Sequence, residues 1–288
     1  MLVSQSHRIV VITPDRILAE ERTAIITYAR QHPDIRHRSL AWKMIDDDVA
    51  FVSPSTVYRI LVNEYLICRW QPKLNRDKRI RYKGNCPDEK WQSDIRYVKI
   101  SRRTYYLIIF IDEYSRYIVH YELMLSMDGN SVSLAALDAF STVADDAKPE
   151  IQTDNGSGYI SHEFKLVLTD RGVGHHRIYP YCPEENGLVE RTNRTLGEKI
   201  DELEPANFQE AKEEISKIID WYNHERLHSG INFLTPWDMY RGNPEQRLQE
   251  RQDKLRKAKQ RRREQNLKVK QRSLALDSEI KKKIKTYW

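Results

Sequence analysis

The middle of the chain contains the feature that most constrains its fold, three apolar runs separated by short polar segments. The runs span residues 95–100, 105–111 and 117–125 and are rich in aromatic and β-branched side chains. The segments between them, residues 101–103 and 112–116, are polar. This pattern predicts three consecutive antiparallel strands that form a meander. We therefore expect a β-sheet at the centre of the protein.

Helical and strand patterns alternate after the meander, which predicts an α/β fold. Residues 130–144 have helical apolar spacing, with Asn130 or Ser131 as the expected N-cap. The further expected elements are a strand at residues 150–153, a helix at 164–168 that ends near Gly172, a strand at 176–179, and a helix after the loop 180–187. The predicted order is therefore βββαβαβα.

Three acidic residues stand at separate points of this pattern. Asp94 opens the first expected strand, Asp154 follows the fourth, and Glu190 lies in the last helix with thirty-five residues between it and Asp154. If the fold gathers them, protons or cations must neutralise their mutual repulsion. Oxygen ligands favour Mg²⁺ or Mn²⁺, and two such ions roughly 3.5–4 Å apart support displacement at phosphorus. Because 42 of 288 residues are acidic, spacing alone leaves a chance grouping open.

Motifs around these acids resemble the catalytic core of integrases and transposases. The matching segments are residues 91–94, 111–116, 153–157, 183–190, 221–228 and 234–236. Within the retroviral integrase superfamily, the chain resembles bacterial insertion-sequence transposases of the IS3 type over roughly residues 36–242. The resemblance implies an RNase H-like fold, a mixed five-stranded sheet with flanking helices.

By this resemblance Asp94, Asp154 and Glu190 are the catalytic residues of a DDE transposase, and each ligates metal. The implied cofactor is a pair of Mg²⁺ or Mn²⁺ ions. The implied activity of this polynucleotidyl transferase is hydrolysis that frees a 3′-hydroxyl at the end of an insertion sequence, followed by attack of that hydroxyl on target DNA. The implied partners are element ends, target DNA, further copies of the chain and a separately encoded upstream subunit.

One position departs from the family pattern. The family usually has Lys or Arg seven residues after the glutamate, where it contacts the DNA backbone, and this chain has Gly197. Arg194 lies on the same helix face as Glu190, so Arg194, and less directly Lys199, are expected to contact DNA. The departure keeps open an alternative, a catalytically impaired DNA-binding protein derived from a transposase. A nuclease of RNase H type would explain the acids but not the motif at residues 221–228.

Residues 1–68 are expected to form a small helical, helix-turn-helix-like DNA-binding region. Helical spacing occurs at residues 17–29, 39–45 and 54–66. Ser53 and Pro54 suit the N-cap and the first position of the third helix. The third helix is expected to enter the DNA major groove. The residues expected to contact DNA lie near its outward N-terminal half and are Ser55, Thr56, Tyr58 and Arg59. The alternative is a bundle that supports the core or binds a partner subunit.

The remaining regions are defined by charge. Residues 69–90 are expected to form a basic linker, residues 91–242 the integrase-like core, and residues 243–288 a basic tail that is helical or disordered. Residues 247–285 contain 16 Lys or Arg against 5 Asp or Glu. Such a tail is attracted to DNA phosphates, and the alternative is a solvated helix or extension without a ligand.

Composition excludes several other classes. No stretch approaches the length of a membrane span, so no membrane partner is expected and the cytoplasm is the expected location. The three cysteines, Cys68, Cys86 and Cys182, stand far apart and give neither a disulfide framework nor a CxxC zinc site. His175 and His176 are adjacent on an expected strand, so their side chains face opposite sides and do not readily serve one metal ion.

Overall fold

The computed structural model describes residues 13–67, 84–101, 103–144, 146–178 and 186–286. The chain forms two compact units. The smaller unit combines residues 1–74 with residues 245–288, and the larger one contains residues 75–244. Most of the expected linker and most of the loop at residues 180–187 lie outside the described residues. The predicted tail therefore belongs to the same unit as the N-terminal helices.

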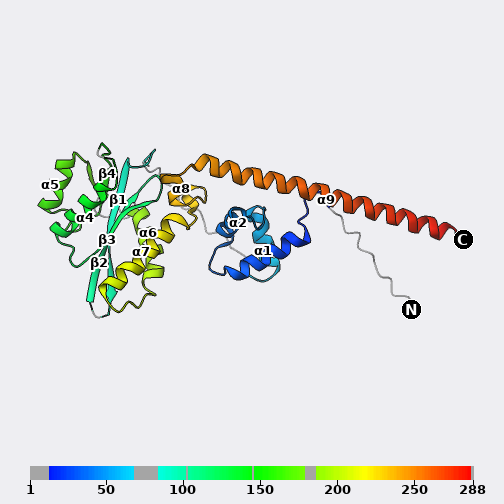
Figure 1. Cartoon of the computed structure of the whole chain (residues 1–288), viewed down its shortest axis with the longest axis horizontal. Coiled ribbons are helices and arrows are strands. Elements are labelled where there is room, and N and C mark those ends of the chain that lie inside the picture. The colour runs from blue at the N-terminus through cyan, green and yellow to red at the C-terminus, as the bar shows by residue number, and fades with distance from the viewer. Residues whose placement is uncertain (1–12, 68–83, 102, 145, 179–185, 287–288) are drawn as a thin grey trace. The chain divides into compact units, whose positions relative to one another are not determined.

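Five strands form one mixed sheet in the larger unit (Figure 1). They are β1 (Lys90–Ile100), β2 (Arg103–Asp112), β3 (Ile118–Met124), β4 (Glu150–Thr153) and β5 (His175–Arg177). Their order across the sheet is β3-β2-β1-β4-β5. The first three strands pair antiparallel, whereas β4 runs parallel to both β1 and β5. The expected RNase H-like mixed sheet is confirmed.

Helices cover both faces of this sheet (Figure 1). They are α4 (Gly129–Ser141), α5 (His162–Arg171), α6 (Gly187–Ile200), α7 (Phe208–His224) and the short α8 (Pro236–Tyr240), with a 3₁₀ turn at Ser229–Ile231. Side chains alternate along a strand, so Ile109 joins the core under α6 and α7 while Phe110 joins the core under α4 and α5. The sheet is thus buried on both sides.

The first strand begins earlier than the sequence pattern predicts. β1 starts at Lys90 and pairs with β4 from there, so the prediction that Asp94 opens the strand was wrong, and Asp94 lies inside it. The cause is Trp91, which is fully buried and stacks on Phe140 with 5.8 Å between ring centroids. The polar residues that follow Trp91 interrupt the apolar pattern but are themselves buried.

Two further boundaries differ by a few residues. The N-cap of α4 is Asp128, whose carboxylate accepts a hydrogen bond from the Ser131 amide at 2.9 Å, so neither Asn130 nor Ser131 is the cap. The fifth strand starts one residue before the expected position. Gly172 ends α5 in the left-handed conformation, with φ of 64°, as a glycine readily does.

The N-terminal helices are α1 (Ala19–Gln31), α2 (His37–Asp46) and α3 (Pro54–Asn63). They enclose a small apolar core that includes Ile25, Leu40 and Val57. The cap of α3 is confirmed, because Ser53 Oγ accepts a hydrogen bond from the Thr56 amide at 3.3 Å and Pro54 follows it. The assignment of these helices as a DNA-binding helix-turn-helix stays a prediction.

The C-terminal segment forms one long helix, α9 (Pro244–Thr286), which packs on the N-terminal helices largely through polar side chains. Arg251 is 2% exposed and donates hydrogen bonds of 2.8 and 2.6 Å to both carboxylate oxygens of Asp46. Arg262 donates to Glu21 at 2.9 Å. Neither α9 nor any other helix in the described part of the chain is apolar enough to cross a lipid bilayer.

Candidate active site

Asp94 and Asp154 lie on neighbouring strands. The parallel register pairs Gln92 of β1 with Gln152 of β4, so two residues further on Asp94 lies opposite the position of Asp154, just beyond the end of β4. Asp94 pairs with Ile109 on β2, which belongs to the core under α6 and α7. The Asp94 side chain therefore points to the face of the sheet that α6 covers.

A local hydrogen bond fixes the Asp154 carboxylate. Its Oδ1 accepts from the Gly156 amide at 2.9 Å, and a Cβ at residue 156 would approach this oxygen to 3.0 Å. On the preceding residue, Thr153 Oγ1 lies 2.9 Å from His175 Nε2. This contact gives His175 a structural role beside the site, and Asp154 itself stays half-buried at the strand end.

Glu190 lies in the first turn of α6 and is exposed. Two hydrogen bonds join this helix to β1 on either side of the glutamate. The Val189 amide donates to Gln92 Oε1 at 3.3 Å, and Asn193 Nδ2 donates to Asp94 Oδ2 at 2.7 Å. The turn that carries Glu190 is therefore held beside Asp94.

The three acids influence one another electrostatically. Burial raises the pKa of Asp94 to about 6, and the charges of Asp154 and Glu190 act in the same direction. The hydrogen bond from Asn193 acts in the opposite direction because it stabilises the carboxylate. Asp94 is thus a half-buried acid whose ionised form is disfavoured by its surroundings.

The structure brings the acids to one region without closing them into a ligand cluster. The oxygens of Asp94, Asp154 and Glu190 are not all within 4.8 Å of one another. Such spacing is expected of three carboxylates that have only each other's charges nearby. The donor set consists of carboxylate oxygens, which suits Mg²⁺ or Mn²⁺.

Sequence reasoning missed Gln92 and Asn193, two of the side chains that join β1 to α6. Asn193 is buried at 7% exposure and lies three residues after Glu190, one turn along the same helix. That spacing was a usable signal. Gln92 stands two residues before Asp94 and is 3% exposed. Its burial could not be predicted, because it is a polar residue in a polar stretch of the sequence.

Gly197 is buried beneath the guanidinium of Arg96, so it does not share the exposed side of α6 with Glu190 and Arg194. A Cβ at residue 197 would lie 2.5 Å from Arg96 Nη1. Arg96 Nη2 donates to both carboxylate oxygens of Asp201, at 2.7 and 2.6 Å, and Nη1 donates to the Asn193 carbonyl at 3.3 Å. The guanidinium of Arg96, a residue of β1, thus occupies the space that a Cβ atom at residue 197 would need.

The other predicted DNA contacts on α6 differ in their surroundings. Arg194 is exposed on the helix. Lys199 is also exposed, but its ammonium lies 4.3 Å from the centre of the Trp221 ring, a cation–π contact with α7. DNA binding by Lys199 would compete with this contact, whereas Arg194 has no cation–π contact within the described residues. Both assignments stay predictions.

The predicted contact residues of α3 make mostly local interactions. Arg59 donates to the Ser55 carbonyl at 3.4 Å and to Thr56 Oγ1 at 3.3 Å, and Tyr58 packs against His37. Ser55 and Arg59 are exposed. Their accessibility is consistent with the expected DNA contacts without testing them.

The segment at residues 221–228 has a structural role in the larger unit. The Asn223 side chain accepts from the Ile118 amide at 2.9 Å and donates to the Ile118 carbonyl at 3.1 Å. His228 is buried, which together with nearby arginines lowers its pKa to about 3. These side chains hold α7 and the following loop to the edge of the sheet.

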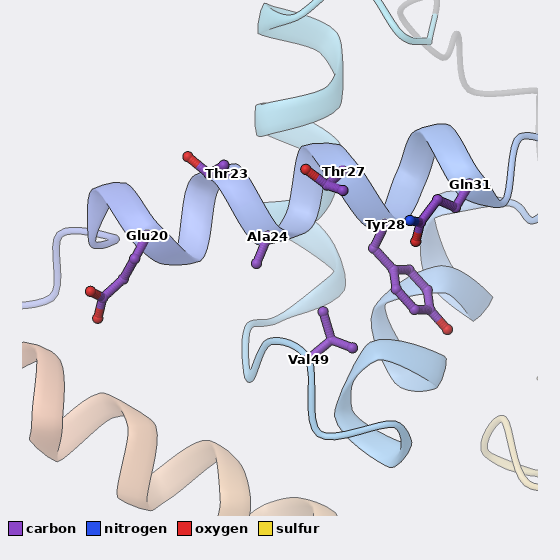
Figure 2. A pocket seen from close by; sticks show the side chains of 7 residues that line it. All are labelled: Glu20, Thr23, Ala24, Thr27, Tyr28, Gln31 and Val49. Carbon is purple, nitrogen blue, oxygen red and sulfur yellow. The ribbon is translucent and has the colours of Figure 1, made fainter.

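One surface hollow lies in the smaller unit, whereas the three acids belong to the larger one. The hollow has a volume of about 580 Å³. Its lining side chains come mainly from one side of α1, with Val49 opposite (Figure 2). In the described part of the chain, no group of three metal-ligating side chains lies in its lining. We therefore place the candidate active site at the acids.

Comparisons with known proteins match the part of the chain that contains the three acids. Two family models, each described as Integrase core domain, match residues 84–183 and 171–236. The transposase for insertion sequence element IS904 of Lactococcus lactis subsp. lactis (strain IL1403) is 29% identical over 166 residues, which cover 56% of this chain and 65% of the relative. The Gag-Pro-Pol polyprotein of Human T-cell leukemia virus 3 (strain 2026ND) is 34% identical over 115 residues, 40% of this chain and 8% of the polyprotein. The matched segments thus span less than two thirds of these relatives.

Two solved structures are also similar. The catalytic core domain of HTLV-2 integrase in complex with magnesium aligns with a TM-score of 0.44 at 23% identity, covering 55% of this chain and 99% of that one. The simian T-cell lymphotropic virus intasome in complex with the PP2A regulatory subunit B56 gamma aligns with a TM-score of 0.49 at 21% identity, covering 76% and 74%.

The sheet order and the matches to the integrase core together define the class of protein. Residues 84–236 of the chain, which make up most of the larger unit, are similar to the integrase core domain. The chain is also similar to an insertion-sequence transposase, in line with the resemblance of its motifs.

Proposed function

We propose that this protein is a DDE transposase, a metal-dependent polynucleotidyl transferase that cleaves DNA at the 3′ ends of an insertion sequence and joins them to target DNA. The observation that carries the proposal is the placement of Asp94 on β1, Asp154 at the end of the neighbouring β4, and Glu190 on a helix that two hydrogen bonds tie to β1. The matches of residues 84–183 and 171–236 to the integrase core domain support the same reaction class.

We propose that Asp94, Asp154 and Glu190 hold two Mg²⁺ or Mn²⁺ ions. The fit is supported by the oxygen donors and by the pKa of Asp94, which burial and the other two acids keep high. Bound metal would supply activation of an attacking oxygen and stabilisation of the leaving oxygen. The chain's own contribution is positional, since Asn193 orients the Asp94 carboxylate and the Gly156 amide orients that of Asp154.

DNA is the proposed substrate, both as element ends and as target. Arg194 and Lys199 would contact the backbone near the site, and Ser55, Thr56, Tyr58 and Arg59 would contact DNA from α3. Holding two ends together requires more than one copy of the chain, so a homo-oligomer is part of the proposal. A separately encoded upstream subunit and a cytoplasmic location stay predictions.

The alternative, a catalytically impaired derivative that only binds DNA, rested on Gly197. The Arg96 guanidinium lies against this glycine and keeps a positive charge on the same part of α6, so the missing side chain is not by itself a sign of impaired activity. No other described feature of the site favours the impaired form.

The test uses linear DNA that carries the inverted repeats flanking the gene. We expect the intact chain with Mg²⁺ to nick these ends and to join them to a second DNA. Asp154→Asn and Glu190→Gln should bind the same DNA and perform neither step. Asp146→Asn, at an exposed acid outside the site, is the matched control. Binding without nicking by the intact chain would support the impaired form.

A further inference from the structure

A second group of metal-ligating side chains lies on the face of the sheet opposite Asp94. His120 and Glu122 are two residues apart on β3, so their side chains point to the same face. His120 pairs with Phe110, which belongs to the core under α4 and α5, and Asp138 lies on α4. One ligand atom from each of these three residues lies within 4.8 Å of the other two.

The histidine of this group has an unused nitrogen. His120 Nε2 is buried and has no hydrogen-bond partner among the described residues. Buried polar atoms of native proteins nearly always have a partner. Burial also lowers the pKa of His120, so its imidazole is neutral and keeps a lone pair for a ligand.

The two carboxylates complete a donor set. Burial raises the pKa of Glu122, and the Asp138 charge adds to this effect. Lys212 acts in the opposite direction and is therefore the competitor for the Glu122 carboxylate. One imidazole nitrogen with two carboxylate oxygens suits zinc and similar first-row ions, whereas Mg²⁺ and Ca²⁺ prefer oxygen ligands alone.

We propose that His120, Glu122 and Asp138 bind one Zn²⁺ or similar transition-metal ion, with water at the open coordination position. The ion joins the edge strand β3 to α4. The site is separate from the three acids by donor chemistry as well as by position, and it does not depend on the proposed function. Its role is structural, since the sheet lies between it and Asp94.

Zinc binding by the full chain tests this proposal. Isothermal titration with Zn²⁺ is carried out on protein stripped with a chelator, in an Asp154→Asn background and in excess Mg²⁺, so that the oxygen-only site does not contribute. We expect one bound equivalent. His120→Ala should abolish it, and Glu122→Gln and Asp138→Asn should weaken it by about tenfold or more. His162→Ala, at an exposed histidine on α5, is the matched control and should bind as the parent does.

A second readout separates ligation from folding. Cu²⁺ bound in place of zinc shows nitrogen superhyperfine splitting in its electron paramagnetic resonance spectrum when an imidazole coordinates it. This splitting should be present in the parent and in the near-isosteric Glu122→Gln at saturating Cu²⁺, and absent in His120→Ala. If His120→Ala binds one zinc equivalent as tightly as the parent, if Glu122→Gln leaves the affinity unchanged, or if the parent binds no zinc, the proposal is overturned.

Discussion

Asp94 sets the charge balance of the site at the scale of single residues. Its pKa is about 6 in the folded chain, well above the ordinary 3.8, so its stabilising contribution is complete below about pH 4 and disappears as the pH rises through 6. Metal-free Asp94→Asn should therefore be more stable than the parent above about pH 7, by at most about 3 kcal/mol. The two should converge below about pH 4. Urea denaturation in a chelator across this range measures the difference.

Magnesium gives the reciprocal result. Added Mg²⁺ should stabilise the parent at neutral pH and leave Asp94→Asn nearly unchanged, because the variant lacks a charged ligand. Asp146→Asn is the control for a change of net charge. The free energies of unfolding of the parent and Asp94→Asn could instead change with pH in parallel. That result would contradict the raised pKa of Asp94.

Gly197 and Arg96 form a coupled pair at the same scale. Alanine at residue 197 would press its Cβ against the Arg96 guanidinium and displace it from Asp201. Gly197→Ala should therefore destabilise the chain by about 1–2 kcal/mol, within the range seen for overpacking. In an Arg96→Ala background the same change should stabilise it by about 0.5–1 kcal/mol, the helix preference of alanine.

This reversal of sign is measured as a double-mutant cycle in urea. Thr195→Ala on the same helix is the control, and its effect should be the same in both backgrounds. Equal effects of Gly197→Ala with and without Arg96 would mean that the guanidinium can move aside at no cost, and Arg96 would then not explain the glycine.

At the scale of elements, Asn223 of α7 replaces the missing neighbour of the edge strand β3. Its side chain satisfies both backbone groups of Ile118 and is 3% exposed. Asn223→Ala should leave an amide and a carbonyl without partners, which costs about 1–3 kcal/mol. Hydrogen exchange at the Ile118 amide should become faster. Asn130→Ala, at an exposed position of α4, is the control, and unchanged exchange in Asn223→Ala would refute the role.

Elements with regular apolar spacing were predictable from sequence, and elements built by polar burial were not. The meander and α6 were expected because apolar residues recur regularly among their buried positions. The start of β1 was missed because Gln92 and Ser93 are polar and yet fully enclosed. Likewise, the spacing of Asp94, Asp154 and Glu190 indicated one site, but the bond from Asn193 and the cover of Arg96 over Gly197 depend on contacts between distant residues.

On the scale of the whole molecule, the packing of α9 was not predictable because its contact face carries arginines in place of a leucine stripe. Arg251 and Arg262 are among the buried residues of this helix. The count of basic residues in the sequence assumes that every one of these side chains is available to bind DNA. The ion pairs that α9 makes with acids of the N-terminal helices, among them Asp46, Asp48 and Glu20, change this count.

The distribution of these pairs predicts which part of α9 carries any DNA binding. Lys268, Lys270 and Arg272 are exposed beyond the paired segment, so each can release counterions from a phosphate. Replacing the three by Gln should reduce the slope of log affinity against log salt by about 0.9 for each phosphate that the helix no longer neutralises. Replacing Arg247, Lys254 and Arg261, which pair with acids, removes the same charge and should change the slope less. Equal slopes for the two triple variants, measured by fluorescence anisotropy with duplex DNA, would mean that α9 acts only through net charge and that its packing on α1 and α2 does not select the contacting residues.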